Sequence, residues 1–171
     1  LFWNYLNILN SQDINFFSSF KKFFSIKFLL LIVFLQIIMG AFVSGLDAGM
    51  IYQTWPLMNT SFFPDDTIIK SLGDFLIFEN KSLIQFYHRI LAYLILIYSL
   101  FIGIKLSLDN NYILKKSFFK YFFILIFQVV LGILTLVSGL NIYLAALHQF
   151  TGVLLILSIL NLNYKIIDEK S

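Results

Sequence analysis

Four long apolar segments dominate the chain and determine the architecture it is expected to adopt. They cover about residues 22–44, 82–106, 117–140 and 142–164. Each reaches the ~20 residues that a helix needs to cross a bilayer. The first segment does so only if the lysines at its start extend their side chains to the interface. The pattern predicts an all-α membrane protein, a four-transmembrane-helix bundle within residues 21–171. Residues 1–20 are expected to be the end of a preceding helix followed by a cytoplasmic linker.

The four segments form an internal repeat. The first and third contain the similar stretches Gln36-Ile37-Ile38-Met39-Gly40 and Gln128-Val129-Val130-Leu131-Gly132. Each of these segments is followed by one that opens with a histidine, His88 in the second and His148 in the fourth. We therefore expect a pseudo-symmetric repeat of two helix pairs.

The composition supports a membrane protein and excludes several other classes. The chain is 60% hydrophobic and 12% charged, whereas about a quarter of the residues of a soluble domain are charged. The pI of about 9.1 does not indicate nucleic-acid binding, because the excess of lysine falls in loops on one side of the predicted helices. The sequence has no cysteine, which excludes disulfides, iron–sulfur clusters and thiolate ligands.

The distribution of charge predicts which ends of the helices face the cytoplasm. Lysines precede the first segment and crowd the loop between the second and third: Lys21, Lys22, Lys27, Lys105, Lys115, Lys116 and Lys120, against Asp109. The long loop between the first two segments instead carries five acidic residues against Lys70 and Lys81. Positive charge favours the cytoplasmic or matrix side, so this long loop and the tight turn before residue 142 are expected to face outward.

The only two histidines in the sequence are its main candidate functional residues. His88 and His148 lie at matching depth just inside two apolar segments, and an ionisable residue within a membrane helix usually marks function. Each shares a helix face with a small residue, Ala92 or Gly152, which leaves room for a flat ring. One interpretation is a haem iron held between the two imidazoles. The alternatives are hydrogen bonding between helices or a small-residue packing seam. Zinc fits less well, because a closed zinc site uses about four ligands.

The residues beside His88 limit the chemistry expected of this region. The Arg89 guanidinium is suited to a haem propionate, and the alternative is an arginine that snorkels to the interface. Lys81 is a weaker candidate for the same contact. Gln85 shares a helix face with His88 and cannot take up a proton at physiological pH, so a cofactor site is favoured over a catalytic one. No catalytic residue is assigned.

The loop after the first segment, residues 45–59, is rich in glycine and aromatic residues and contains Pro56. It is expected either to cover the end of the bundle as a lid or to lie in the membrane interface, with Tyr52 and Trp55 as belt residues. Packing is a more usual role than iron ligation for the three methionines, Met39, Met50 and Met58.

Several of these stretches together resemble a known family. They are Gly45-Leu46-Asp47-Ala48-Gly49, Tyr52-Gln53-Thr54-Trp55-Pro56-Leu57-Met58, Phe78-Glu79-Asn80, Gln85-Phe86-Tyr87-His88-Arg89 and His148-Gln149. From about residue 21 to residue 164 the chain resembles the C-terminal half of haem A synthase, of the cysteine-free type found in alphaproteobacteria and mitochondria. Residues 1–9 resemble the end of the preceding helix in that family.

The resemblance implies a fold, an activity and a set of partners. The family has eight transmembrane helices in two homologous halves, and it oxidises a methyl group of haem O to the formyl group of haem A for cytochrome oxidase. The resemblance implies that His88 and His148 are the axial ligands of a b-type haem in an oxidoreductase. It also implies that haem O is the substrate and is handled by a missing N-terminal half, so this chain alone is expected to be inactive.

The expected surroundings follow from the same resemblance. They are the lipid of a bacterial inner membrane or the mitochondrial inner membrane, the missing N-terminal half and haem O synthase; a homo-oligomer is left open. Two other functions fit the composition and the histidines equally well. One is a free-standing four-helix b-type cytochrome that transfers electrons, and the other is a non-enzymatic haem carrier or assembly factor. Only the loop motif separates these from haem A synthase.

Overall fold

The computed structural model describes residues 1–17, 24–108 and 110–168, and within them it contains helices and loops but no strand. The helices are α1 (Phe2–Asn10), α2 (Phe24–Gly45), α3 (Lys81–Ser107), α4 (Tyr112–Val137) and α5 (Ile142–Asp168). The helices α2 to α5 are each long and apolar enough to cross a membrane. The prediction of an all-α membrane protein with four transmembrane helices is therefore confirmed.

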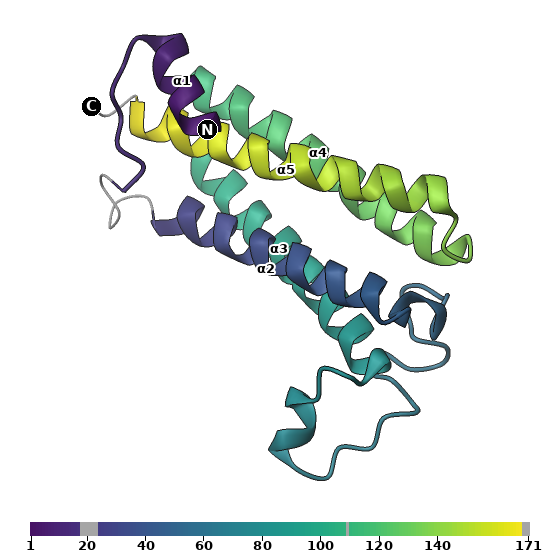
Figure 1. Cartoon of the computed structure of the whole chain (residues 1–171). Coiled ribbons are helices and arrows are strands. Elements are labelled where there is room, and N and C mark those ends of the chain that lie inside the picture. Colours follow the sequence, from purple (N-terminus) through teal and green to yellow (C-terminus); the bar gives the residue numbers. More distant parts are fainter. Residues whose placement is uncertain (18–23, 109, 169–171) are drawn as a thin grey trace.

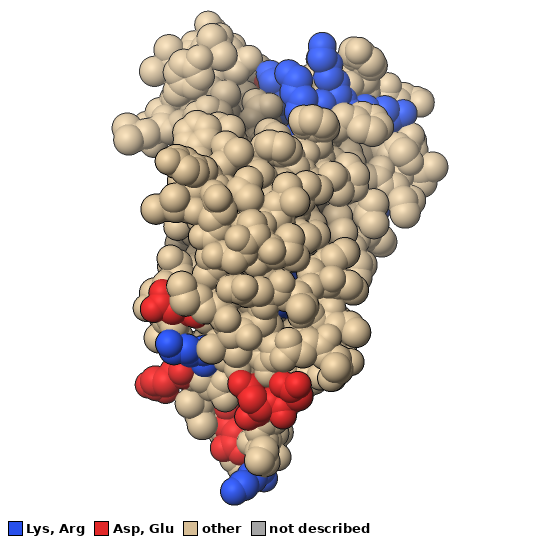
Figure 2. All heavy atoms as spheres, turned by 90° about the vertical axis from the view of Figure 1, so that its right-hand side faces the viewer, with Lys and Arg blue, Asp and Glu red and all other residues tan. Residues whose placement is uncertain are grey.

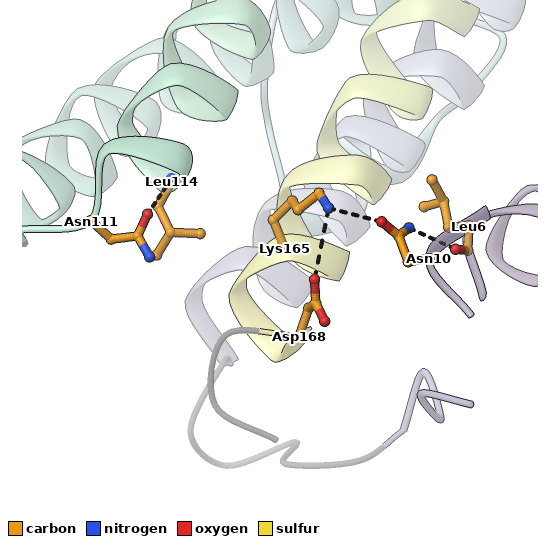
Figure 3. A network of polar contacts seen from close by, with 6 residues as sticks. All are labelled: Leu6, Asn10, Asn111, Leu114, Lys165 and Asp168. Carbon is orange, nitrogen blue, oxygen red and sulfur yellow. Dashed lines mark hydrogen bonds and ion pairs between the residues drawn. The ribbon is translucent and has the colours of Figure 1, made fainter. Parts of the chain in front are cut away.

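The ends of α4 differ from the expected range of 117–140. The helix begins at Tyr112, because the side-chain oxygen of Asn111 accepts a hydrogen bond from the backbone N–H of Leu114 at 3.0 Å and caps it (Figure 3). The expected start was too late because Lys115 and Lys116 interrupt the apolar pattern over these first turns. The helix ends at Val137, before Gly139 and Leu140 adopt left-handed backbone conformations with φ of 72° and 62°.

The other helix ends lie nearer to their expected positions. Helix α3 extends the expected range by one residue at each end, with Asn80 as its N-terminal cap. Helix α5 continues past residue 164 to Asp168, because Ile166 and Ile167 still pack into the core. Helix α2 ends at Gly45 instead of 44, and its expected first residues, 22 and 23, lie outside the described residues.

The four long helices pack as two pairs, α2 with α3 and α4 with α5 (Figure 1). The segment 46–80, which we call the long loop, joins α2 to α3 and contains short 3-10 helices at Ala48–Met50 and Leu72–Leu76. A tight turn joins α4 to α5 at the same end of the bundle, which we call the loop end. The opposite end is the lysine end. The order of elements is thus helix, connection, His-bearing helix, occurring twice.

The apolar core that joins the two pairs lies in the half of the bundle nearer the lysine end. Leu6 and Ile14 also belong to it, and its buried members within the long helices come from the first half of α2 and α4 and the second half of α3 and α5: Ile26, Leu29, Ile32, Val33, Ile95, Ile102, Leu114, Phe118, Tyr121, Leu125, Leu155, Ile159, Leu162, Tyr164, Ile166 and Ile167. A buried hydrogen bond of 2.5 Å between the Ser99 and Tyr121 hydroxyls also joins α3 to α4. Close packing of this kind is what holds helices together in lipid, where the hydrophobic effect between them is weak.

Helix α1 packs against the C-terminal part of α5. The Trp3 ring contacts the Tyr164 ring edge-on at 5.2 Å. Lys165 Nζ donates to the Asn10 side-chain oxygen at 3.3 Å (Figure 3). The chain then turns back, and Trp3 Nε1 donates to the carbonyl of Ile14 at 2.7 Å. The expected linker begins in this region, although its residues 18–20 lie outside the described residues.

Charge is separated along the long axis of the molecule. Lys115, Lys116 and Lys120 cluster at the lysine end, whereas the carboxylates in view in Figure 2 gather at the opposite end, towards the long loop. Three charged residues used in the sidedness argument, Lys21, Lys22 and Asp109, lie outside the described residues. The expectation that the lysine end faces the cytoplasm or matrix remains a prediction.

Candidate functional site

The two histidines occupy matching cradles, one in each helix pair. His88 of α3 lies against Gly40 of α2, where an added Cβ atom would stand 3.2 Å from the imidazole Cε1 atom. His148 of α5 lies against Gly132 of α4, where an added Cβ atom would stand 3.0 Å from Cε1. Both glycines therefore allow an imidazole to pack directly on a helix backbone. The repeat expected from the sequence is therefore also present in the contacts of the two histidines with these glycines.

A glutamine one turn before each glycine reinforces the repeat. Gln36 Nε2 donates to the backbone carbonyl of His88 at 3.0 Å, and Gln128 Nε2 donates to the backbone carbonyl of His148 at 2.9 Å. A polar side chain within a membrane helix needs a partner, because no water is available there to replace it. Each amide therefore ties a histidine-bearing helix to its companion at the level of the imidazole.

The hydrogen bonds of the imidazoles assign the same tautomer to both. His148 Nδ1 lies 3.1 Å from the backbone carbonyl of Gln128, so Nδ1 carries the proton and donates it. His88 Nε2 lies 3.3 Å from Gln36 Nε2, an amide nitrogen that can only donate, so His88 Nε2 accepts and its proton is on Nδ1. The Nε2 lone pair of His148 is therefore available to a metal. The Nε2 lone pair of His88 is occupied by the hydrogen bond from the Gln36 amide, which would have to be released before this atom could bind a metal.

The surroundings of the two imidazoles also differ. In the second pair the Thr151 hydroxyl donates to the Gln128 side-chain oxygen, and it lies close to the carbonyls of Leu147 and His148 as well. In the first pair Gln36 Oε1 and His88 Nδ1 are buried, and neither has a hydrogen-bond partner in the described part of the chain. His148 is therefore held by more hydrogen bonds than His88.

Arg89 and Gln85 fasten the long loop to α3. Gln85, which is 3% exposed, donates to the backbone carbonyl of Tyr52 at 2.7 Å. Arg89 donates to the same carbonyl at 3.1 Å and to that of Leu57 at 3.3 Å. Its half-buried guanidinium is thus bonded to the long loop. Its Nε atom has no partner among the described residues, so the group keeps capacity for an acidic ligand.

A second set of contacts holds the loop at Tyr52. This side chain is 2% exposed, and its hydroxyl donates to Asp65 at 2.6 Å and accepts from the backbone N–H of Asp66 at 3.4 Å. Ser82, in the first turn of α3, donates to Asp66 at 2.7 Å. Burial and the neighbouring carboxylates raise the pKa of Tyr52. Burial raises the pKa of Asp66, but the hydrogen bonds from Ser82, Tyr52 and Thr67 outweigh it, and the pKa lies below its ordinary value.

The long loop also reaches the other helix pair. Gly49 packs so closely on Leu140 that an added Cβ atom would lie 2.9 Å from Leu140 Cδ2. Leu140 belongs to the turn between α4 and α5, so one loop contacts both pairs at the loop end. This position fits the expected lid. Trp55 is 45% exposed and is compatible with an interfacial position, whereas the buried Tyr52 is not a belt residue.

The residues of this site fit a haem better than a bare metal ion. Two imidazoles come from different helix pairs, each with a glycine cradle beneath its ring. Within the described ranges, no group of three or more His, Cys, Asp or Glu side chains could hold a metal ion. Met58 of the long loop is buried, in keeping with the expected packing role, whereas Met50 is exposed.

The sequence did not identify Gln36, Gln128 and Thr151 as functional residues. The two glutamines belong to the repeated stretches, and their recurrence four residues before a glycine was the available signal. Their contacts with the histidine carbonyls depend on how the helices are aligned across each pair. Lys81, the weaker candidate for a propionate, is an exposed residue at the start of α3.

Comparison with known proteins places the chain in a family. The model of the COX15-CtaA family, described as a cytochrome oxidase assembly protein, matches residues 1–160. A protein of Pelagibacter ubique (strain HTCC1062) named Heme A synthase is 45% identical over 141 residues, which cover 81% of this chain and 40% of that protein. A Heme A synthase of Wolbachia pipientis subsp. Culex pipiens (strain wPip) is 40% identical over 127 residues, covering 74% and 37% of the two chains.

These relatives are longer than the chain, which spans about two fifths of their length. A third relative of the same name, from Jannaschia sp. (strain CCS1), is 37% identical over 130 residues, covering 76% of this chain and 34% of its own. No solved structure matches the chain significantly. The family model nevertheless spans nearly all of the helices and both cradles, and the chain belongs to the COX15-CtaA family of cytochrome oxidase assembly proteins.

Proposed function

We propose that the chain is the C-terminal half of a haem A synthase and that it holds a b-type haem between His88 and His148. The full-length enzyme would oxidise the methyl group of haem O to the formyl group of haem A. The observation that carries the proposal is the pair of matching cradles, in which one imidazole from each helix pair packs on a glycine of its companion helix. Membership of the family and the name shared by the relatives support it.

The residues of the site would hold and shield the haem. His88 and His148 would supply the two axial nitrogens, and Arg89 would direct its free Nε–H towards a propionate at the loop end. The long loop, fastened by Gln85 and Arg89, would exclude water from the outer side of the ring. A haem iron with two imidazole ligands transfers single electrons and has no open position for a substrate.

The position of Gln85 supports a division of labour between the two halves of the enzyme. Its side chain is committed to the Tyr52 carbonyl, and it cannot act as a proton acceptor. The oxidation of haem O would then take place in the N-terminal half, and the haem of this half would serve structure or electron transfer. This chain by itself would be inactive as an enzyme.

The proposed surroundings follow from the same assignment. The protein would be a multi-pass protein of the bacterial inner membrane or the mitochondrial inner membrane, and haem O synthase would be its supplier of substrate. The four apolar helices require membrane lipid around them. Self-association into a homo-oligomer would be compatible with the extensive exposed apolar surface of these helices.

The test uses the full-length protein with His88→Ala and His148→Ala. Each change removes an axial ligand that no water can replace in lipid, so we expect loss of the low-spin haem b spectrum and a fall in haem A production. Gln149→Ala is the matched control, because Gln149 is the exposed neighbour of His148 on the same helix. The measurements are haem b content, optical spectrum and chromatography of extracted haems after co-expression with haem O synthase.

The possible results separate the competing functions. Full low-spin haem b in both histidine variants would show that the ligands are elsewhere. Loss of bound haem O with an intact N-terminal half would place the substrate site in this half. Haem b binding without any haem A production by the unaltered full-length protein would favour a cytochrome that only transfers electrons.

A further inference from the structure

Three lysines near the start of α4, Lys115, Lys116 and Lys120, have no ion pair, hydrogen bond or ring contact in the described part of the chain. The other described lysines at this end each contact an aromatic ring or a carboxylate: Lys27 over Phe16, Lys105 over Phe101 and Lys165 beside Asp168. The acidic residue nearest to the three in sequence, Asp109, lies outside the described residues. The lysines of α4 are therefore the group at this end whose positive charge is available to a ligand.

The same lysines border a groove of about 550 Å³ on the surface of α4. Its other lining residues are aromatic: Tyr112, Phe119 and Phe123. Phe119 is 67% exposed and Phe123 is 74% exposed, whereas the buried residues of α4 in this region pack into the core: Leu114, Phe118, Tyr121 and Leu125. The groove thus lies on the side of the helix turned away from the core, at the end of the molecule where lysines gather in Figure 2.

The charged and apolar parts of the groove are ordered by depth in the membrane. Helix α4 starts at the lysine end and runs towards the loop end, so Lys115 lies nearest the interface and Phe123 lies deepest. At a rise of about 1.5 Å per residue, the three lysines lie within about 8 Å along the helix axis, and Phe123 lies about 5 Å beyond Lys120. Phe119 and Phe123 belong to a helix that is apolar and long enough to cross a membrane. A ligand that fills the groove must therefore have a polar part at the interface and an apolar part in the hydrocarbon.

We propose that this groove binds an anionic glycerophospholipid. Its phosphate group would lie among Lys115, Lys116 and Lys120, and an acyl chain would lie along Phe119 and Phe123. A soluble anion would use the lysines but leave the phenylalanines unoccupied, and a lipid without net charge would use the rings but leave the lysines unpaired. An acidic head joined to an apolar chain satisfies both parts of the groove.

The general bias of lysine towards one side of a membrane does not account for this arrangement. It explains why lysines lie at this end of the helices, but not why three of them surround an aromatic groove on one helix. Lys105 lies at the same end and outside the groove, with its ammonium 4.3 Å from the centre of the Phe101 ring. A variant at Lys105 therefore separates binding in the groove from attraction of anionic lipid to the whole end of the molecule.

The experiment compares Lys116→Gln/Lys120→Gln with Lys70→Gln/Lys105→Gln in the full-length protein. Each double variant removes two positive charges from exposed lysines, but only the first removes them from the groove. The purified proteins are titrated with phosphatidylglycerol or phosphatidylcholine in detergent micelles, and bound lipid is counted by native mass spectrometry. Thermal unfolding is measured alongside to establish that the variants are folded.

We expect the groove variant to raise the Kd of the first bound phosphatidylglycerol by about tenfold or more, because each lysine beside an anionic lipid contributes roughly fivefold. The control variant should change this Kd by less than about twofold. Phosphatidylcholine has no net charge and should bind all three proteins equally. If the double variant does not accumulate, Lys120→Gln alone is expected to raise the Kd about fivefold.

Two further measurements test the place and the nature of the ligand. Phosphatidylglycerol with a photoreactive diazirine in its acyl chain should label residues 112–123 of the unaltered protein, and glycerol phosphate, which lacks acyl chains, should not displace it. Equal losses of affinity in the two double variants, an unchanged affinity in the groove variant, labelling confined to other helices, or displacement by glycerol phosphate would each overturn the proposal. None of these results bears on the haem, which the histidine variants test separately.

Discussion

The close contact between Gly132 and His148 predicts the consequence of adding a single methyl group at Gly132. A Cβ atom at this position would lie 3.0 Å from His148 Cε1, 3.5 Å from Nδ1 and 3.6 Å from Nε2. The imidazole cannot easily move away, because its Nδ1–H is bonded to the Gln128 carbonyl. Gly132→Ala is therefore expected to displace the ring by a few tenths of an ångström or to break that bond.

The magnitude follows from two opposing terms. Alanine is favoured over glycine within a helix by about 1 kcal/mol, whereas overpacking of a close contact costs about 1–3 kcal/mol. Because the methyl group would meet the proposed haem ligand, most of the cost should appear as weaker haem binding. We expect Gly132→Ala to weaken retention of haem b by about 1–2 kcal/mol, or roughly 5- to 30-fold.

Two other glycines of the same bundle provide matched comparisons. At Gly40 the added Cβ atom would lie 3.2 Å from His88 Cε1, and the freer His88 ring can shift, so Gly40→Ala should cost less than about 1 kcal/mol. At Gly45 nothing lies within 4 Å, so Gly45→Ala should change haem retention by no more than about 0.5 kcal/mol.

The assay is the rate of haem b transfer from the purified full-length variants to an excess of a haem-scavenging protein, with thermal unfolding measured alongside. The expected order of rates is Gly132→Ala, then Gly40→Ala, then Gly45→Ala. Loss of haem from Gly132→Ala no faster than from Gly45→Ala would refute the argument that the glycine exists to admit the imidazole. Faster haem loss from Gly40→Ala than from Gly132→Ala would refute the argument that the His148 ring is held more firmly than the His88 ring.

Three further predictions concern the long loop and the sidedness of the bundle. Gln85→Leu removes a buried hydrogen bond to the Tyr52 carbonyl, so proteolysis within the loop should accelerate by about five- to tenfold. An unchanged rate would show that this bond does not fasten the loop. The pKa of Asp66 lies below its ordinary value in the folded protein, so its contribution to loop docking is present above the unfolded pKa of about 4 and is lost as the pH falls through the lowered value. Proteolysis measured between pH 8 and pH 3 should therefore accelerate only at the acidic end. Asp66→Asn should abolish that dependence on pH. A cysteine placed at Asn59 should react with an impermeant reagent from outside whereas one at Asn110 should not, and the opposite pattern would invert the proposed topology.

The sequence predicted the parts of the fold that depend on composition and period. Four apolar runs of sufficient length required four membrane helices, and the recurrence of Gln and Gly before each histidine-bearing helix indicated two related pairs. The start of α4 was wrong because hydropathy alone was used. The capping oxygen of Asn111 determines that start, and an asparagine four residues before two lysines is a weak signal in an apolar chain.

The parts of the site that could not be predicted depend on contacts between elements distant in sequence. The position of Arg89 at the start of α3 left two roles open, a propionate partner or a snorkelling side chain, and its bonds to the loop carbonyls were not among them. Those bonds depend on the path of residues 52–57 over the end of α3. Similarly, the bond between His148 and the Gln128 carbonyl requires a particular rotation of α4 against α5, which the apolar pattern does not determine.

The location of the apolar core has a consequence for the order of events in the biogenesis of the protein. The buried cluster joins both helix pairs near the lysine end, whereas the histidine cradles lie beyond it towards the loop end. The helices can therefore insert and associate before any prosthetic group is present, since the contacts that bring the pairs together do not involve the histidines. The proposed haem would then bind after the pairs have associated, beneath a loop that Gln85 and Arg89 fasten to α3. Such an order would let the cell store an assembled apoprotein and load it when haem is supplied.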